Sequence, residues 1–368
     1  MRFVFKTSYD ADIKWFKHGA QLFWYMLLLA ALVALPLYFV WTGNPYLLGE
    51  ITAVLIFSVS CLGLMLLTGQ TGLASLGHAA FMAMGCYANI LLLNAGLPWL
   101  IAFPLAGLLA GFFGTMIAFP VLRLHGVYLA LATLAMSIIT GDVIDLTERW
   151  TGGVSGITVP DIEIFGYVIN KYANPYAFYY LCLVVVILCV AAYRNLLRAP
   201  TGRSFAAVRD SEVSAQAMGV NLTRTKATSF FLSCTAAGLA GALFGHSATF
   251  VTNETFDIVM SITLFLSIVV GGLGFIHGAF LGAIVSGLIP VLIANGRTLL
   301  STSMGININI PGLESALFAG IVIAFVLFEP MGLYGRWLKI RTFFELFPFY
   351  RKDMFRRQKS YLKTERVQ

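Results

Sequence analysis

Histidine and cysteine are the residue types in this chain that could bind a metal or perform nucleophilic chemistry. The five histidines form no H-x-x-x-H pair and have no acid beside them at ligand spacing. The five cysteines lie in apolar runs without metal-ligand spacing, which is typical of small buried side chains. No set of Ser, His and an acid is recognisable either. The sequence therefore predicts no catalytic residue and no metal site.

Binding of nucleotide phosphates would need a glycine-rich loop of defined pattern. The P-loop requires Gly-Lys before Ser or Thr, so that the lysine reaches the phosphates, and Gly-Lys does not occur in this chain. The run GGLGFIHG at 271–278 fails the G-x-G-x-x-G pattern, because His277 stands where the last glycine belongs. We expect no bound cofactor, so energy for any work on a solute must come from a partner or an ion gradient.

The composition is that of an integral membrane protein. Hydrophobic residues make up 59% of the 368 residues and charged residues only 11%, with a mean hydropathy of +0.83. A soluble domain carries about a quarter charged residues. The sequence predicts an all-α polytopic protein with ten membrane-spanning helices of about 20 residues each. They are expected near 22–41, 47–68, 74–95, 97–121, 126–147, 176–194, 227–249, 258–274, 276–296 and 312–329.

The polar side chains that fall deep within these predicted spans are neutral. They are Gln70, Ser75, His78, Asn89 and Thr133. The acids lie near span ends, where a side chain can reach the interface. A proton-driven carrier is expected to bury a pair of acids near the middle of the membrane, so this pattern weighs against ion coupling.

Glycines are expected to have two roles. Glycines spaced four apart let helix backbones approach closely and predict packing seams. Others, Gly72 and Gly77, stand with Gln70, Thr71 and Ser75 at the start of the third span and predict broken backbone at membrane depth. Such irregular backbone is tolerated only where protein or a water-filled cavity surrounds it. The expected seams contain Gly107 and Gly111, Gly241 and Gly245, and Gly274, Gly278 and Gly282.

The longest polar interval, 194–226, predicts the orientation in the membrane. It holds six basic residues against two acids, Asp210 and Glu212. Because Lys and Arg are retained on the cytoplasmic side during insertion, this loop is expected inside the cell, and ten spans then place both termini there. The expected division is a cytoplasmic N-terminus 1–21, a transmembrane domain 22–335 and a basic cytoplasmic tail 336–368.

A short helix over 205–218 is expected inside this loop, ending at Gly219. Such a helix could offer Phe205 and Val208 to a pocket in a soluble partner, with a polar rim around them. The rim would consist of Arg209, Asp210 and Glu212. The alternative is a solvated surface helix without a partner.

The tail interleaves aromatic residues with Arg and Lys, and the chain has a net charge of +7. Both features could suggest nucleic acid, but the basic residues flank membrane spans and so report orientation. We expect no nucleic-acid partner. A basic, aromatic segment beside a membrane span is expected to lie on anionic lipid, the alternative being a cytoplasmic partner.

Five separated motifs resemble the permeases of branched-chain amino acid type ABC importers, in the order found in that family. The central one is GRSFAAVRDSEVSAQAMGVN at 202–221, which is similar to the family's coupling loop. The others are LTGQTGLASLGHAAFMAMGCYA at 67–88, RLHGVYLALATLA at 123–135, TGGVSGI at 151–157 and VVGGLGFIHGAFLGA at 269–283. Together they cover most of the chain and resemble the M-type subunit of type II importers.

The resemblance implies a transport subunit, not an enzyme, in a bacterial inner membrane. It implies a second, similar permease in a heterodimer, two ATP-binding subunits that hydrolyse ATP, and an extracytoplasmic solute-binding protein. The residues that match the coupling loop are Gly202, Arg203, Ala206, Arg209, Asp210, Glu212 and Gly219. Gln70, Gly72, Ser75, Gly77 and His78 match a glycine-rich segment that we assign to the translocation path or its gate, with Asn89 and Thr133 as further candidates.

The solute is expected to be a branched-chain or related hydrophobic amino acid. Related permeases move urea, amides or aromatic acids, so these solutes remain alternatives within the same class of importer. A second class of hypothesis is an autonomous secondary transporter or channel, and the missing acid pair is the feature against it. A membrane-embedded enzyme is a third class, for which the sequence offers no catalytic set.

Overall fold

The computed structural model describes residues 19–42, 45–120, 126–304, 313–329 and 331–346. The expected cytoplasmic segment 1–18 and tail residues 347–368 lie outside this part of the chain.

Helices occupy all ten predicted spans, which confirms the all-α polytopic fold. Each consists largely of apolar residues with helix-compatible side chains, and the two long connections within the described part, between α6 and α8 and between α8 and α11, carry short elements of their own. Their bounds are α2 (Gly19–Thr42), α3 (Pro45–Leu64), α4 (His78–Asn94), α5 (Trp99–Ala118), α6 (Val127–Leu146), α8 (Pro175–Arg198), α11 (Leu222–Ala248), α12 (Ile258–Gly271), α13 (Ile276–Met304) and α14 (Leu313–Phe328).

Eight candidate spans in the described part of the chain are long and apolar enough to cross a membrane. The predicted spans 74–95 and 312–329 instead form shorter helices, α4 with 17 residues and α14 with 16. The third span was predicted to be helical from residue 74, but α4 begins only at His78. Residues 72–77 before it are non-helical, so the predicted third span begins with irregular backbone.

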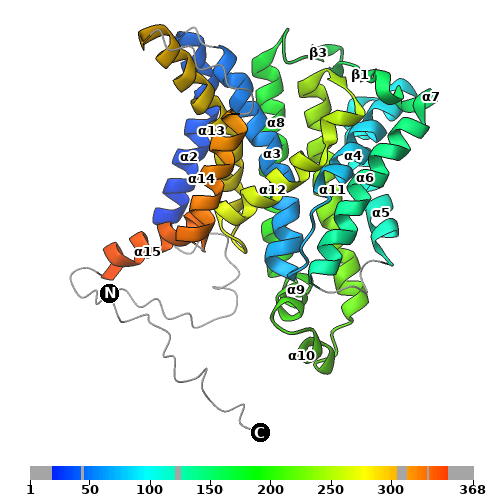
Figure 1. Ribbon diagram of the computed structural model, residues 1–368, viewed down its shortest axis with the longest axis vertical. Coiled ribbons are helices and arrows are strands. Elements are labelled where there is room, and N and C mark those ends of the chain that lie inside the picture. The colour runs from blue at the N-terminus through cyan, green and yellow to red at the C-terminus, as the bar shows by residue number, and fades with distance from the viewer. Residues whose placement is uncertain (1–18, 43–44, 121–125, 305–312, 330, 347–368) are drawn as a thin grey trace.

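Helix α11 lies at the centre of the bundle, where it packs against α3, α4 and α5 (Figure 1). A Cβ atom added to Gly241 would lie 1.9 Å from the Met82 carbonyl oxygen, and one added to Gly85 would lie 2.2 Å from that of Gly238. The same contact occurs between α13 and α12, where a Cβ on Gly282 would lie 2.0 Å from the Ser267 oxygen. The predicted seams at Gly241 and Gly282 are therefore backbone-to-backbone contacts, whereas a Cβ on Gly107 or Gly245 would first meet a side chain, and Gly274 lies in the turn between α12 and α13.

One end of the bundle carries short elements between α6 and α8 and after α11 (Figure 1). Strand β1 pairs antiparallel with β4, with Ile157 opposite Val251, and β2 pairs with β3 in a hairpin. These pairings fasten the segment after α6 to the end of α11. The elements are α7 (Glu148–Thr151), η3 (Gly153–Ser155), β1 (Ile157–Thr158), β2 (Ile162–Ile164), β3 (Tyr167–Ile169), β4 (Phe250–Val251) and η4 (Asn253–Phe256).

The opposite end carries α9 (Pro200–Asp210), α10 (Glu212–Ala217) and α15 (Gly332–Leu346). The prediction of one helix over 205–218 is wrong. The first helix begins at Pro200, whose fixed φ suits the first helical position, and Ser211 is extended and caps α10 through its side chain. Gly219 follows with a φ of +85°, as expected of a residue that ends a helix.

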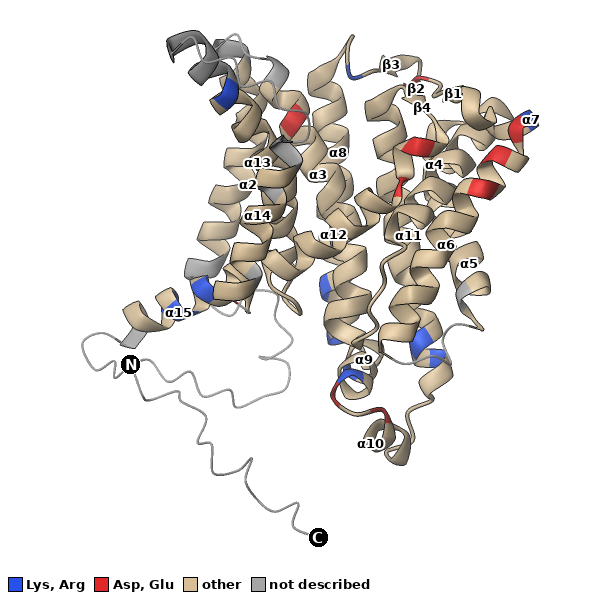
Figure 2. Cartoon of the chain, viewed as in Figure 1, with Lys and Arg blue, Asp and Glu red and all other residues tan. Residues whose placement is uncertain are grey.

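Charge separates between the two ends of the described structure. Figure 2 shows most Asp and Glu near α6, α7 and the strands, and most Lys and Arg near α8, α9, α11 and α15. This is the asymmetry on which the predicted orientation depends.

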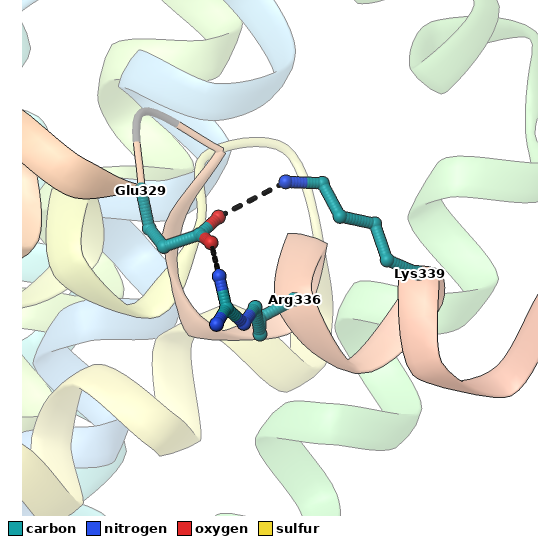
Figure 3. A network of polar contacts seen from close by, with 3 residues as sticks. All are labelled: Glu329, Arg336 and Lys339. Carbon is teal, nitrogen blue, oxygen red and sulfur yellow. Dashed lines mark hydrogen bonds and ion pairs between the residues drawn. The ribbon is translucent and has the colours of Figure 1, made fainter. Parts of the chain in front are cut away.

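Glu329 connects the end of α14 to α15 (Figure 3). Its carboxylate accepts a hydrogen bond from Lys339 at 3.1 Å and another from Arg336. Hydrogen bonds from these two cations lower the pKa of the Glu329 carboxyl. Because that pKa is lowered, both ion pairs persist at any pH above the ordinary glutamate pKa. They are lost only as the pH falls through the lowered pKa. They fix where α15 leaves the bundle.

Candidate functional site

The third predicted span is broken at its start. Helix α3 passes into a π-helical turn, η1 (Met65–Gln70), after which residues 72–77 are non-helical and α4 begins. Gly72 has a φ of +78°, which glycine adopts without the strain of other residues. The structure thus confirms the predicted break in the backbone, and π-helical turns are often found at functional positions.

Side chains from α6 and α12 accept hydrogen bonds from backbone amides of the broken segment and of the first turn of α4. The Leu76 amide donates to Thr133 Oγ1 at 2.9 Å, and the Ala79 amide donates to Ser261 Oγ at 3.0 Å. A Cβ on Gly77 would lie 1.9 Å from the Thr133 carbonyl oxygen, so only glycine fits there. Ser75 and Gly77 of this segment are therefore enclosed by protein, as irregular backbone at membrane depth requires, whereas Gly72 is exposed.

Ser75 and His78 place unpaired polar atoms inside the bundle. Both residues are fully buried. His78 Nε2 lies 3.2 Å from the Ser60 carbonyl oxygen, whereas His78 Nδ1 and Ser75 Oγ have no hydrogen-bond partner among the described residues. Unpaired buried polar atoms are uncommon and require an explanation. Here they offer neutral donors and acceptors beside a broken helix.

The structure divides the predicted path residues into two groups. Asn89 lies eleven residues beyond His78 along α4, about 16 Å at the helical rise. Its amide nitrogen lies 2.9 Å from His246 Nε2, to which Trp99 Nε1 also donates at 3.2 Å. Because both neighbours are donors, that ring nitrogen accepts and His246 is neutral. The group at the break consists of Gln70, Gly72, Ser75, Gly77, His78 and Thr133.

Phe205 and Val208 point into the chain's own core. They are 0% and 3% exposed, so the expectation that they fill a pocket in a partner does not fit the structure. The exposed apolar side chains of this region belong instead to Val213 on α10 and Met218 after it, at 80% and 85%. The other predicted coupling residues Gly202, Arg203, Ala206, Arg209 and Asp210 lie on α9, Glu212 begins α10 and Gly219 follows it.

An ion pair joins α10 to α11. Lys226 Nζ donates to Glu212 Oε2 at 2.7 Å, and the lysine side chain is only 5% exposed. Asn221 caps α11 by accepting from the Arg224 amide, so α11 begins inside the polar interval. The two short helices are therefore held on the end of the central helix.

We predict that Lys226→Met lowers the free energy of unfolding by about 1.5–3 kcal/mol, because Glu212 loses a charged hydrogen-bond partner that water reaches poorly. Thermal unfolding in detergent measures the loss. The exposed Arg224→Met, in the first turn of the same helix, is the control and should unfold as the wild type does. A double-mutant cycle with Glu212→Gln should be non-additive, and additive effects would show that the two side chains do not interact.

Among the described residues, no three His, Cys, Asp or Glu side chains lie close enough together to hold a metal ion. Asp145 accepts from Asn253 at 2.7 Å near the end of α6. The side chains of Ser75 and His78 beside the break can donate and accept hydrogen bonds.

Residues 46–328 match the family described as branched-chain amino acid transport system / permease component. This chain belongs to that permease family. The family is one of transport components, in agreement with the resemblance of the five motifs.

Three relatives show how far the similarity extends. The LivM high-affinity branched-chain amino acid transport system permease proteins of Salmonella typhimurium and Escherichia coli are each 32% identical over 256 residues, covering 64% of this chain and 60% of theirs. The probable LivM branched-chain amino acid transport permease protein of Methanocaldococcus jannaschii is 24% identical over 320 residues, covering 85% and 91%. The match thus spans less than two thirds of the first two relatives.

Sequence reasoning missed three residues of this permease that hold the site together. Ser261 lies in an apolar run of α12, Trp99 begins α5 and Lys226 was taken only as a marker of orientation. Ser261 and Trp99 carry no local signal, because their partners are far away in sequence. Lys226 does carry a local signal, because it directly precedes a long, largely apolar run that was predicted to be a span.

Proposed function

We propose that the chain is the permease subunit of an ATP-binding-cassette importer and forms part of the path for branched-chain or related hydrophobic amino acids. The observation that carries this proposal is the connection between α9 and the broken segment before α4. Helix α9, one of two short helices at one end of the bundle, contacts the irregular backbone that lies beside unpaired polar atoms. Such an arrangement lets a partner at that end act on a path inside the bundle.

The partners we propose are a second, similar permease, two ATP-binding subunits and an extracytoplasmic solute-binding protein. The ATP-binding subunits hydrolyse ATP, because this chain has no phosphate-binding loop. One of them docks on α10, where Val213 and Met218 are exposed beside polar residues. The end with α9 and α10 then faces the cytoplasm of a bacterial cell and both termini lie there, in accord with its basic residues.

Helix α15 is proposed to rest on the cytoplasmic surface of the bilayer. Three residues separate it from the end of α14, and Trp337, Ile340 and Phe344 are exposed on it. Spacings of three and four place these side chains on one face, suited to the headgroup region of anionic lipid. This is the part of the predicted basic tail that the structure describes.

The proposed function is tested by purifying the chain from its native membrane, identifying the proteins that accompany it and reconstituting the complex in liposomes. We expect uptake of labelled leucine only with the solute-binding protein outside and ATP inside. Urea and benzoate, offered in parallel, decide among solutes of the same importer class. Flux driven by a solute or ion gradient through the purified chain alone would contradict the proposal and favour a secondary transporter.

A further inference from the structure

We propose that Arg209 is the positioning residue that transmits movement of α9 to the broken segment. This inference rests on the proposed function and assigns to Arg209 a role inside the chain. The sequence had suggested instead that Arg209 belongs to the rim of a docking surface.

The primary contact is between the guanidinium of Arg209 and the π-helical turn. Arg209 Nη1 donates to the Gly69 carbonyl oxygen at 2.6 Å, across 140 positions of sequence. Gly69 lies in the last two residues of η1, where carbonyl groups lack partners within the helix. A charged donor at this distance makes a strong hydrogen bond. Helix α9 is therefore attached directly to η1, at the start of the break.

A third segment, the turn between α12 and α13, meets the same point. Gln70 Nε2 donates to the Gly274 carbonyl oxygen at 2.9 Å, and the Gly274 amide lies 3.1 Å from Met65 Sδ. A Cβ on Gly274 would lie 3.0 Å from Arg209 Nη1, and a Cβ on Gly69 would lie 2.7 Å from the Gly274 nitrogen. Two glycine backbones thus touch each other and the guanidinium, which leaves little space for α9 to move without moving both.

The backbone of Arg209 also lies close to the break. A Cβ on Gly72 would lie 3.6 Å from the Arg209 Cα. Gly72 begins the non-helical residues that lead to Ser75 and His78. On the other side, α12 runs from Ser261, which binds the first turn of α4, to the Gly274 turn. Arg209 therefore contacts the segment before the break and the turn that ends one of the two helices holding it.

Arg209 is suited to transmission because the rest of α9 is well anchored. Phe205 and Val208 fix the helix on the core, and Lys226 fixes α10 on α11. A force applied to α10 by a docked subunit then moves α9 as a unit, since packed interiors deform little. The guanidinium is the polar side chain through which that unit holds η1 and, through it, the broken segment.

The test uses the complete complex with Arg209→Gln, and Arg224→Gln as the matched control. Arg224 is an exposed arginine at the same end of the bundle whose side chain is not part of the junction. We measure co-purification of the ATP-binding subunits, ATP hydrolysis, leucine uptake and amide hydrogen exchange in residues 69–77.

In Arg209→Gln we expect co-purification unchanged and ATP hydrolysis within twofold of wild type. Leucine uptake per ATP should fall at least tenfold, and exchange in 69–77 should become faster while the rest of the bundle is unaffected. Arg224→Gln should behave as wild type in all four measurements.

Loss of the ATP-binding subunits from Arg209→Gln would overturn the inference and make the arginine a docking residue. An unchanged ratio of uptake to ATP hydrolysis would overturn it too, while the proposed function stands because the wild type still transports. If the wild-type complex shows no ATP-driven uptake, the proposed function fails and the inference with it.

Discussion

Replacing Gly241 by leucine is expected to destabilise the protein by more than about 3 kcal/mol, at or beyond the upper end of the usual cost of overpacking. A Cβ at this position would lie 1.9 Å from the Met82 carbonyl oxygen, so α11 and α4 would have to separate. The obstacle is backbone, which cannot change rotamer to make space. Since α11 is the central helix, the loss should affect the whole bundle.

This effect is measured by thermal unfolding in detergent, with the reactivity of the buried thiols as the readout of unfolding. Cys61, Cys86, Cys182 and Cys234 are buried and become reactive when the bundle opens. Gly320→Leu is the control, because nothing lies within 4 Å of a Cβ on Gly320 in α14. Equal stability of the two variants would show that the α4 and α11 backbones are not in contact.

Replacing Val213 and Met218 together by aspartate is expected to weaken binding of the ATP-binding subunits by at least about 30-fold, since central apolar contacts of an interface contribute 2 kcal/mol or more. Both side chains are exposed, so the fold should be unchanged. Leucine uptake and co-purification of the ATP-binding subunits with the permease should be lost together. This pattern differs from that of Arg209→Gln, which is expected to retain the partner and lose only coupling.

The matched control is Val154→Asp, which changes an equally exposed valine, 80% accessible, on η3 at the opposite end. It should retain the ATP-binding subunits. Full uptake by the Val213 and Met218 double variant would show that the docking surface is not on α10. Phe205→Ala is unsuitable for this test, because Phe205 is fully buried and its loss would destabilise α9 itself.

The sequence predicted the elements of this protein well where a local pattern specifies them. Long apolar runs must be helical in lipid, because every backbone amide and carbonyl has to be paired within the span. Glycines four apart predicted the contacts of Gly241 and Gly282, and Gly72 and Gly77 predicted the break before α4. The motif at 202–221 identified the region that forms α9 and α10.

Local patterns failed where one residue has a choice of partners. Phe205 and Val208 form an apolar face, but an amphipathic helix looks the same whether that face packs on its own chain or on another. The chain uses this face itself and exposes Val213 and Met218 instead. Asn89 and His78 are both deep and polar on one helix, yet their distant partners place them in separate groups.

By itself, therefore, the amino-acid sequence determined the all-α membrane fold, the break before α4 and the permease family, because hydrophobicity, glycine spacing and family motifs are properties of contiguous segments. Only the tertiary structure decided that Arg209 binds Gly69, that Ser261 and Thr133 hold the break, and which apolar residues of α9 and α10 remain exposed. Each of these depends on which distant segments pack together, and burial of apolar surface is non-directional, so no local pattern specifies it.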